Sequence, residues 1–348
     1  MVTEDASHPE TGLLDDSLAA PFTRLDAARA ADVLRAGWGL EADELRRLDT
    51  ERDDTFMVAT ASSTYVLKIA HPLDDAAVLD FQCAALAHVA DRDATLPVPH
   101  VTADREGSLL HLVDGDEPRR ARLLSHLPGR VLDYDETSAA DRRAVGAAAA
   151  RLSLALADFE HPGAVRSLPW DLQQVASLRP LLPMVTDAGA RADAEAVLDR
   201  YDASVGAALA ATRQQVVHND LNPDNVLLEP GAAQPVTGIL DFGDMLRTSV
   251  AADLAVVMAY AVDAAGSDDP WDGPYDVAAG YLAVRPLHDD EVRLLPDLVR
   301  TRLAQRQLVN SWLVSADPAN AEYSGRSLAR SAPGLHRVVT TPAPIERG

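Results

Sequence analysis

The strongest constraint on the fold is a pair of polar motifs set among short apolar runs in the second half of the chain. Residues 218–220 read His-Asn-Asp and are followed by Asn225, and residues 241–243 read Asp-Phe-Gly. Short β-rich runs lead into and out of the first motif, and another, 236–240, ends at the second. If the two runs between the motifs pair as a hairpin, Asn225 and Asp241 return to the same end of it. The sequence therefore predicts that both motifs contribute to one site.

The residue types in this site suit phosphoryl transfer from a nucleotide. That reaction needs a metal to bridge the phosphates, donors to hold them, and a carboxylate to position the attacking hydroxyl. We expect Asp220 to orient the hydroxyl, and the oxygens of Asn225 and Asp241 to hold Mg²⁺. Ordinary turn residues would be the alternative, since Asp, Asn and Gly favour turns, but the two motifs in order and in strand context argue against it. A zinc hydrolase using His218 is disfavoured because the other histidines lack ligand spacing.

On these motifs the chain resembles the aminoglycoside phosphotransferase and choline kinase superfamily, which shares the protein-kinase fold. The resemblance covers about 45–265. It implies an α+β, protein-kinase-like two-lobe fold, with a small antiparallel β-sheet lobe and a larger, mostly helical lobe. It also implies Mg²⁺ as cofactor and ATP or GTP as co-substrate.

Lys68 strengthens the resemblance. It is the only lysine among 31 basic residues, and the other basic residues are all arginine. The run 65–69 looks like the third strand of the family's small lobe, whose lysine holds the non-transferred phosphates. A compact ammonium is not equivalent to the planar fork of arginine, so we expect Lys68 to bind the nucleotide.

The chain departs from the protein-kinase pattern in three places. No glycine-rich loop precedes Lys68, and Asn219 stands where protein kinases have the arginine that reads a phosphorylated loop. Both departures favour a small-molecule substrate. The helix after Lys68 should supply a glutamate partner, but the matching position is Gln82, with Asp80 as the alternative.

The resemblance also assigns supporting residues. Asp253 looks like the aspartate that ties down the catalytic loop, and His218 is expected to support the same loop. Residues 123–129 look like the connection between the lobes, where backbone groups near Ser125 and Leu127 would meet the nucleotide base.

Hydrophobic periodicity and breaks divide the chain into four parts. We expect an acidic disordered tail over 1–22, the small lobe over 23–127, the helical catalytic lobe over 128–330 and a loose tail over 331–348. Within the lobes the pattern predicts strands over 56–59, 65–69, 108–113 and 119–124. It predicts helices over 25–36, 75–90, 138–158, 186–212, 250–264, 273–284 and 289–315.

The acceptor is suggested by the stretch 238–260, which looks most like hydroxylysine kinases and their bacterial relatives. That likeness implies phosphorylation of a hydroxylated amino acid or an amino alcohol. Asp244 and Arg247 follow the second motif closely and either touch substrate or are simply solvated. An antibiotic-inactivating phosphotransferase is the first alternative. A catalytically silent nucleotide-binding protein is the second, with Gln82 as the one feature in its favour.

The charge balance limits the partners. The formal net charge of −23 repels nucleic-acid phosphates and anionic membranes, so neither is expected as a partner. The most apolar stretch, 250–265, is interrupted by Asp253 and Asp263, which argues against a membrane span. The N-terminus has no apolar segment typical of a signal peptide, so a cytoplasmic location is expected.

Overall fold

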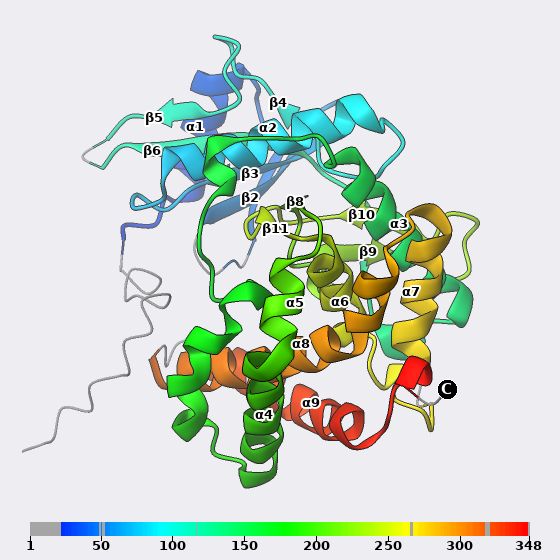
Figure 1. Ribbon diagram of the computed structural model, residues 1–348. Helices are drawn as coiled ribbons and strands as arrows, with labels where there is room; N and C mark the ends of the chain where they lie inside the picture. Colours follow the sequence, from blue (N-terminus) through cyan, green and yellow to red (C-terminus); the bar gives the residue numbers. More distant parts are fainter. Residues whose placement is uncertain are drawn as a thin grey trace, which may run out of the picture.

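The structure is a computed structural model whose described residues are 22–48, 50, 53–115, 117–264, 267–316 and 321–346. They form two lobes, a small one built on an antiparallel sheet and a larger one that is mostly helical (Figure 1). The predicted α+β, kinase-like two-lobe architecture is confirmed. The predicted acidic tail lies outside the described residues, except for its last residue.

The small lobe is a sheet with the strand order β1-β2-β3-β6-β4, in which β5 also pairs with β6. The strands are β1 (Glu44–Leu48), β2 (Asp54–Ala59), β3 (Thr64–Ile69), β4 (Val101–Thr102), β5 (His111–Val113) and β6 (Arg119–Ser125). The predicted hairpin is β2–β3, and in β3 Lys68 pairs with Thr55 on one side and Arg122 on the other. Neighbouring residues of paired strands point to the same face, so Lys68 and Arg122 share one face of the sheet.

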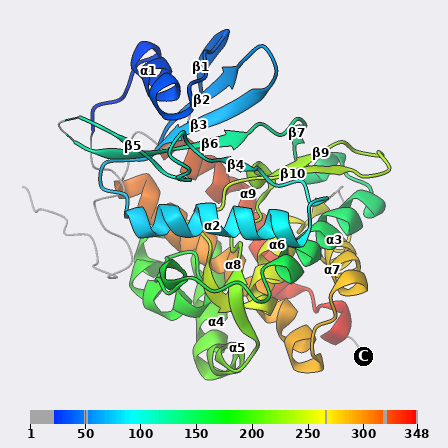
Figure 2. The same cartoon turned by 90° about the horizontal axis from the view of Figure 1, so that it is seen from above.

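Two helices flank this sheet. Helix α1 (Ala27–Trp38) begins at Asp26, whose carboxylate accepts from the Arg29 N–H, and packs with the sheet in a separate small core. Helix α2 (Ala76–Arg92) begins in the same way at Asp75. Figure 2 shows α2 between the sheet and the helices of the large lobe, and its apolar face belongs to the core of the large lobe.

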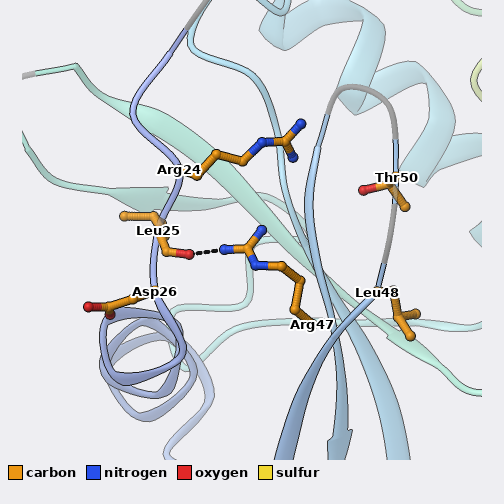
Figure 3. A pocket seen from close by; sticks show the side chains of 6 residues that line it. All are labelled: Arg24, Leu25, Asp26, Arg47, Leu48 and Thr50. Atoms are coloured by element: carbon orange, nitrogen blue, oxygen red, sulfur yellow. Dashed lines mark hydrogen bonds between the residues drawn. The ribbon is translucent and has the colours of Figure 1, made fainter. Parts of the chain in front are cut away.

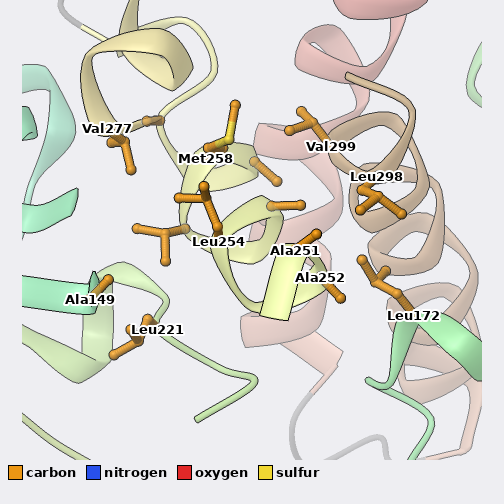
Figure 4. Packing of buried hydrophobic residues seen from close by; sticks show 14 of the residues in the cluster. Ala149, Leu172, Leu221, Ala251, Ala252, Leu254, Met258, Val277, Leu298 and Val299 are labelled. Carbon is orange, nitrogen blue, oxygen red and sulfur yellow. The ribbon is translucent and has the colours of Figure 1, made fainter. Parts of the chain in front are cut away.

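The large lobe is organised around one buried, largely apolar helix. Its α-helices are α3 (Ala139–Ala155), α4 (Ala188–Arg200), α5 (Gly206–Ala210), α6 (Val250–Tyr260), α7 (Asp272–Val284), α8 (Asp289–Ala316) and α9 (Ala321–Thr340). Helix α6 is apolar on nearly all sides, and such helices are buried. Its Ala251 and Leu254 lie among side chains of α7 and α8 (Figure 4). Ser249 caps its first turn through the Ala252 N–H.

Two short antiparallel ladders carry the motifs. Strand β8 (Gln214–Val217) pairs with β11 (Leu246–Ser249), and β9 (Val226–Leu228) pairs with β10 (Val236–Ile239) and with β7 (Arg130–Val131). The loop 218–225 therefore runs from β8 to β9, and the loop 240–245 runs from β10 to β11. Because each loop joins the same two ladders, the loops lie next to each other.

The expected loose tail from residue 331 is wrong. Helix α9 continues to Thr340, and its Leu335 and Val338 are fully buried. The prediction relied on Pro333, which lies inside the helix, but packing against α8 stabilises the helix despite the missing N–H. A long 3₁₀ segment at Leu172–Met184, which contains two prolines, was also not predicted.

Within the described residues, no helix is both long enough and apolar enough to cross a lipid bilayer.

Candidate active site

The two motif loops are joined by hydrogen bonds at their bases. The Leu240 N–H donates to the Asn225 carbonyl at 2.8 Å, and His218 Nε2 lies 2.9 Å from the Leu240 carbonyl. These contacts place Asn225 and Asp241 at the same end of the β9–β10 hairpin, as the spacing of the runs predicted.

The carboxylate of Asp220 is held from both sides. Its Oδ1 accepts from Nη2 of Arg302 at 3.1 Å, and its Oδ2 accepts from the side-chain amides of Asn222 at 2.8 Å and Asn225 at 3.0 Å. Burial and the nearby Asp244 carboxylate raise the pKa of Asp220 to about 7, although Arg302 opposes the rise. A carboxylate with a pKa near neutrality suits a group that accepts a proton.

Asn225 uses only one half of its amide in this network. Its Nδ2 donates to the backbone carbonyl of Asp220 at 2.8 Å as well as to the Asp220 carboxylate. The carbonyl oxygen of the amide, Oδ1, is an acceptor only, and it is the kind of atom that a hard cation prefers as a ligand. Because Nδ2 is held by Asp220, Oδ1 is the atom of this amide that remains available to a cation.

Asp241 lies in a different environment. Its side chain is 51% exposed, its Oδ1 accepts from the Gly243 N–H at 3.0 Å, and its Oδ2 lies 3.7 Å from Nζ of Lys68. Lys68 lowers the pKa of Asp241 to about 2, against the effect of burial. Asp241 also adopts a left-handed backbone conformation, with φ of 51°. It is thus a permanent anion that projects from its loop.

The structure does not contain the helix-borne partner expected for Lys68. Gln82 is buried in α2 and makes no hydrogen bond to Lys68 in the described part of the chain, while Asp80 instead contacts His161 at 3.2 Å. The carboxylate beside Lys68 is that of Asp241. Asp241 of the second motif thus supplies the negative charge beside Lys68 that was expected from helix α2.

A second cation, which the sequence analysis missed, lies beside Lys68. Arg122 is buried on the neighbouring strand, contacts Asp53 at 3.4 Å and helps to lower the pKa of Asp241. One of its guanidinium nitrogens, Nη1, is buried without a hydrogen bond. This side of the small lobe is therefore more cationic than Lys68 alone would make it.

The donor set fits a magnesium ion that shares its ligands with a nucleotide. Mg²⁺ usually takes one or two carboxylates from the protein and completes its shell with phosphates and water. Asp241 and Asn225 offer one charged and one neutral oxygen. The described residues contain no cluster of three or more His, Cys, Asp or Glu side chains able to hold a metal.

Three residues brace the catalytic loop. His218 is fully buried, its Nδ1 accepts from the Asp220 N–H at 3.3 Å, and burial lowers its pKa to about 4, so it is neutral. Buried Asp253 accepts from the Asn219 N–H at 2.8 Å, which is the contact expected of it. Asn219 has φ of 67°, a conformation that asparagine tolerates better than most residues. This gives a backbone reason for asparagine, rather than arginine, at that position.

The residues expected at the nucleotide base lie at the end of β6. The Ser125 N–H donates to the His100 carbonyl at 2.9 Å, and the His126 N–H donates to Thr64 at 3.1 Å. Both N–H groups are thus used within the small lobe. Contact with a base would fall to the Ser125 carbonyl and the backbone of Leu127, and this assignment stays a prediction.

Sequence analysis also missed two arginines of the large lobe. Arg302 comes from α8, 82 residues beyond Asp220, and no motif marks it. Arg166 lies in the segment before the 3₁₀ run and acts electrostatically on Asp244; its pKa is lowered by burial. Arg247, by contrast, is exposed on β11.

A pocket elsewhere in the small lobe is not a candidate site. Its volume is about 490 Å³, and it is lined by Arg24, Leu25, Asp26, Arg47, Leu48 and Thr50 (Figure 3). Arg47 donates there to the Leu25 carbonyl, which ties the entry of α1 to the sheet. None of the motif residues lines this pocket.

Comparison with protein families agrees with the motifs. The model described as the phosphotransferase enzyme family, APH, matches residues 44–287. The chain belongs to this family. It is therefore a phosphotransferase, as the two motifs predicted, and its match to the family ends before α8 begins.

Individual relatives cover most of the chain. A hydroxylysine kinase of Danio rerio is 28% identical over 86% of this chain and 87% of its own length. A homoserine kinase of Azorhizobium caulinodans is 29% identical over 81% of this chain and 84% of its own length. Among solved structures, an amicoumacin kinase has the same fold, with a TM-score of 0.69, 16% identity and coverage of 93% of this chain and 97% of its own.

Proposed function

We propose that this phosphotransferase transfers the γ-phosphoryl group of ATP or GTP to a hydroxyl of a small, amine-bearing acceptor. The acceptor class is a hydroxylysine-like amino acid or an amino alcohol. The observation that carries the proposal is the convergence of four side chains from three parts of the chain: Asn225 donates to Asp220 within one loop, and Lys68 of β3 lies beside Asp241 of the other loop. In-line phosphoryl transfer requires this set of a base, metal ligands and a phosphate-binding cation.

Each of the four residues has a distinct task in this proposal. Asp220 orients the acceptor hydroxyl and takes up its proton, for which its pKa of about 7 is suitable. Asp241 and Asn225 hold Mg²⁺, which when bound neutralises charge on the phosphates. Lys68 holds the phosphates that are not transferred. The fixed amide of Asn225 links the two halves of the site, because it also positions Asp220.

The charges near Asp220 favour an acceptor that carries both an ammonium and a carboxylate group. Asp244 adds a second carboxylate near Asp220, and burial and Asp241 raise its pKa. Arg166 acts on Asp244 electrostatically but forms no ion pair with it within the described residues, and its Nη1 is buried without a partner. Two groups of opposite charge that are not joined in an ion pair can each bind one charge of a zwitterion. The names of the hydroxylysine kinase and homoserine kinase relatives agree with this acceptor class.

The second candidate is an antibiotic phosphotransferase. It is favoured by the fold shared with the amicoumacin kinase. At 16% identity that likeness concerns the fold alone, so the amino-acid or amino-alcohol acceptor is preferred.

A panel of acceptors tests the proposal. Nucleotide consumption and product phosphorylation are measured with hydroxylysine, homoserine, ethanolamine, choline and several aminoglycosides, each with ATP and with GTP. Turnover is expected with a hydroxylated amino acid or an amino alcohol. The Arg166→Gln variant should lose turnover only with those acceptors that carry a carboxylate. Turnover with antibiotics alone would show that the protein is an antibiotic phosphotransferase, the second candidate. Nucleotide binding without turnover of any acceptor would favour a catalytically silent protein.

A further inference from the structure

Helix α8 reaches the catalytic aspartate from a part of the chain that the family model does not match. The match ends at residue 287, and α8 begins at Asp289. Arg302, in the middle of α8, is nevertheless the residue whose guanidinium contacts Oδ1 of Asp220 at 3.1 Å. Its side chain is 1% exposed. A cation this deeply buried is costly unless it is paired, so the geometry of the pair is strongly constrained.

Arg302 is itself held rigidly. Its Nη1 donates to the Trp170 carbonyl and to Oε1 of Gln305, both at 3.0 Å, and its guanidinium lies 4.8 Å from the centre of the Trp170 ring. The ring of Tyr260, at the end of α6, also contacts the guanidinium, whose Cζ lies 6.0 Å from the ring centre. An arginine fixed by hydrogen bonds and aromatic contacts can impose its position on a partner.

Helix α8 also forms hydrogen bonds with the segment that contains Trp170. Nε2 of Gln305 donates to the Pro169 carbonyl at 2.8 Å and to the Asp171 carbonyl at 3.2 Å. One turn of α8 therefore joins the catalytic loop to the segment 169–171. This segment follows Arg166, so α8 also holds one side of the proposed acceptor site in place.

The hydrogen bonds of Asp220 show what Arg302 contributes. The amides of Asn222 and Asn225 occupy Oδ2, and both belong to the catalytic loop itself. Arg302 is the contact to Oδ1 that comes from outside this loop. Without it, the carboxylate could turn about its side-chain bonds, and the oxygen that meets the acceptor hydroxyl would lose its position.

We propose that Arg302 is a positioning residue of the phosphoryl transfer, which acts by fixing the Oδ1 atom of Asp220 against the acceptor hydroxyl. This inference rests on the proposed role of Asp220. It makes α8 a working part of the active site in addition to its place in the core of the large lobe.

The test compares Arg302→Lys and Arg302→Ala with the parent enzyme, using an acceptor that the parent turns over. A misplacement of about 1 Å in an active site can cost about 10²-fold in rate, so kcat should fall by about that factor in Arg302→Ala. KM for the nucleotide should stay within about twofold. Added guanidinium ion should restore part of the kcat of Arg302→Ala in a saturable manner, which a purely structural role would not produce.

A double-mutant cycle with Asp220→Asn provides an independent measurement. If Arg302 acts through Asp220, the Arg302→Lys change should cost little further kcat once Asp220 is replaced, because residues that act as a unit are not additive. Losses that multiply in the double variant would overturn the proposal. So would a folded Arg302→Lys enzyme with the kcat of the parent.

Two further variants keep the test decisive if Arg302→Ala does not fold. Gln305→Leu removes the hold on segment 169–171 and one hydrogen bond to Nη1 of Arg302, but it keeps Nη2 of Arg302 as the donor to Asp220. Its kcat should therefore fall less than that of Arg302→Lys; an equal or larger fall would contradict the proposal. Arg300→Gln is the matched control on the same helix, since Arg300 donates to the Val338 carbonyl at 2.9 Å on the α9 side. Its kcat should stay within about twofold. If the parent turns over no acceptor, the proposed function fails instead.

Discussion

The loop of Asp220, 218–225, and the loop of Asp241, 240–245, join the same two ladders, yet they hold their aspartates in opposite ways. Asp220 receives three side-chain donors, one of them from α8, and has a pKa of about 7. Asp241 is half exposed, lies beside Lys68 and has a pKa of about 2. Asp241 alone of the two has a left-handed backbone, but the difference in pKa comes from burial and from the sign of the neighbouring charges.

This contrast separates two tasks that carboxylates perform in phosphoryl transfer. A group that takes a proton from a hydroxyl works best when its pKa is near the working pH. A metal ligand must stay ionised throughout. The anion of Asp244 acts on Asp220, and the cation of Lys68 acts on Asp241. Replacing the groups on either side of this contrast tests it.

The largest effect is expected from Asp220→Asn. General-base catalysis contributes about 10²- to 10⁴-fold, so kcat should fall by about 10³-fold. The Kd of the nucleotide, measured by calorimetry, should be nearly unchanged because Asp241 and Lys68 remain. Asp224→Asn, which alters an exposed aspartate of the same loop, is the control and should keep full activity. Unchanged turnover in Asp220→Asn would remove the assigned role.

Next in size is the effect of Lys68→Met. Hydrogen bonds to charged groups contribute about 1.5–3 kcal/mol, so nucleotide affinity should fall by about 10- to 100-fold. The pKa of Asp241 should also rise, because Lys68 is the main cause of its low value. Titration of binding at pH 7 measures the first effect, with Arg46→Met on the exposed side of β1 as the control. Equal affinities in the parent and in Lys68→Met would contradict the assignment.

A smaller effect is expected in the pH dependence of Asp244→Asn. Activity requires ionised Asp220, so kcat/KM should fall as the pH drops through the pKa of about 7. The Asp244 anion helps to raise that pKa, so its removal should move the acid limb of the profile to lower pH. Profiles from pH 5 to 9 with one acceptor show the shift. A limb that stays in place or moves to higher pH would break the link between the two aspartates.

The smallest effect concerns stability. The folded-state pKa of His218, about 4, lies below the unfolded value of 6.5, so the unfolded chain binds an extra proton between these values. The contribution of neutral His218 to the free energy of unfolding is therefore fully present above pH 6.5. It is lost as the pH falls towards 4, at about 1.4 kcal/mol per pH unit for one proton. His218→Gln should flatten the decrease in urea-unfolding free energy between pH 7 and 5. An unchanged slope would show that His218 does not titrate on unfolding.

Local patterns in the sequence were sufficient for most of the fold and for four residues of the candidate site. The hairpin between Asn225 and Asp241, the strand of Lys68 and the capped helix α2 each depend on residues close together in the chain. Alternation, turn residues and caps act over short distances, so they can be recognised without a structure. The terminal helix α9 was missed because its stability comes from packing against α8, and its proline suggested a break.

The sequence by itself determined which chemical groups are available: a single lysine, the carboxylates of Asp220 and Asp241 and the amide of Asn225, on which the prediction of phosphoryl transfer rests. Only the tertiary structure decided how these groups are charged and held. Lys68 finds its counter-ion in Asp241 rather than in Gln82, and Asp220 is fixed by Arg302 from a helix 82 residues away. Ion pairs form between groups that folding brings together, and burial sets their pKa values, so neither can be deduced from spacing along the chain.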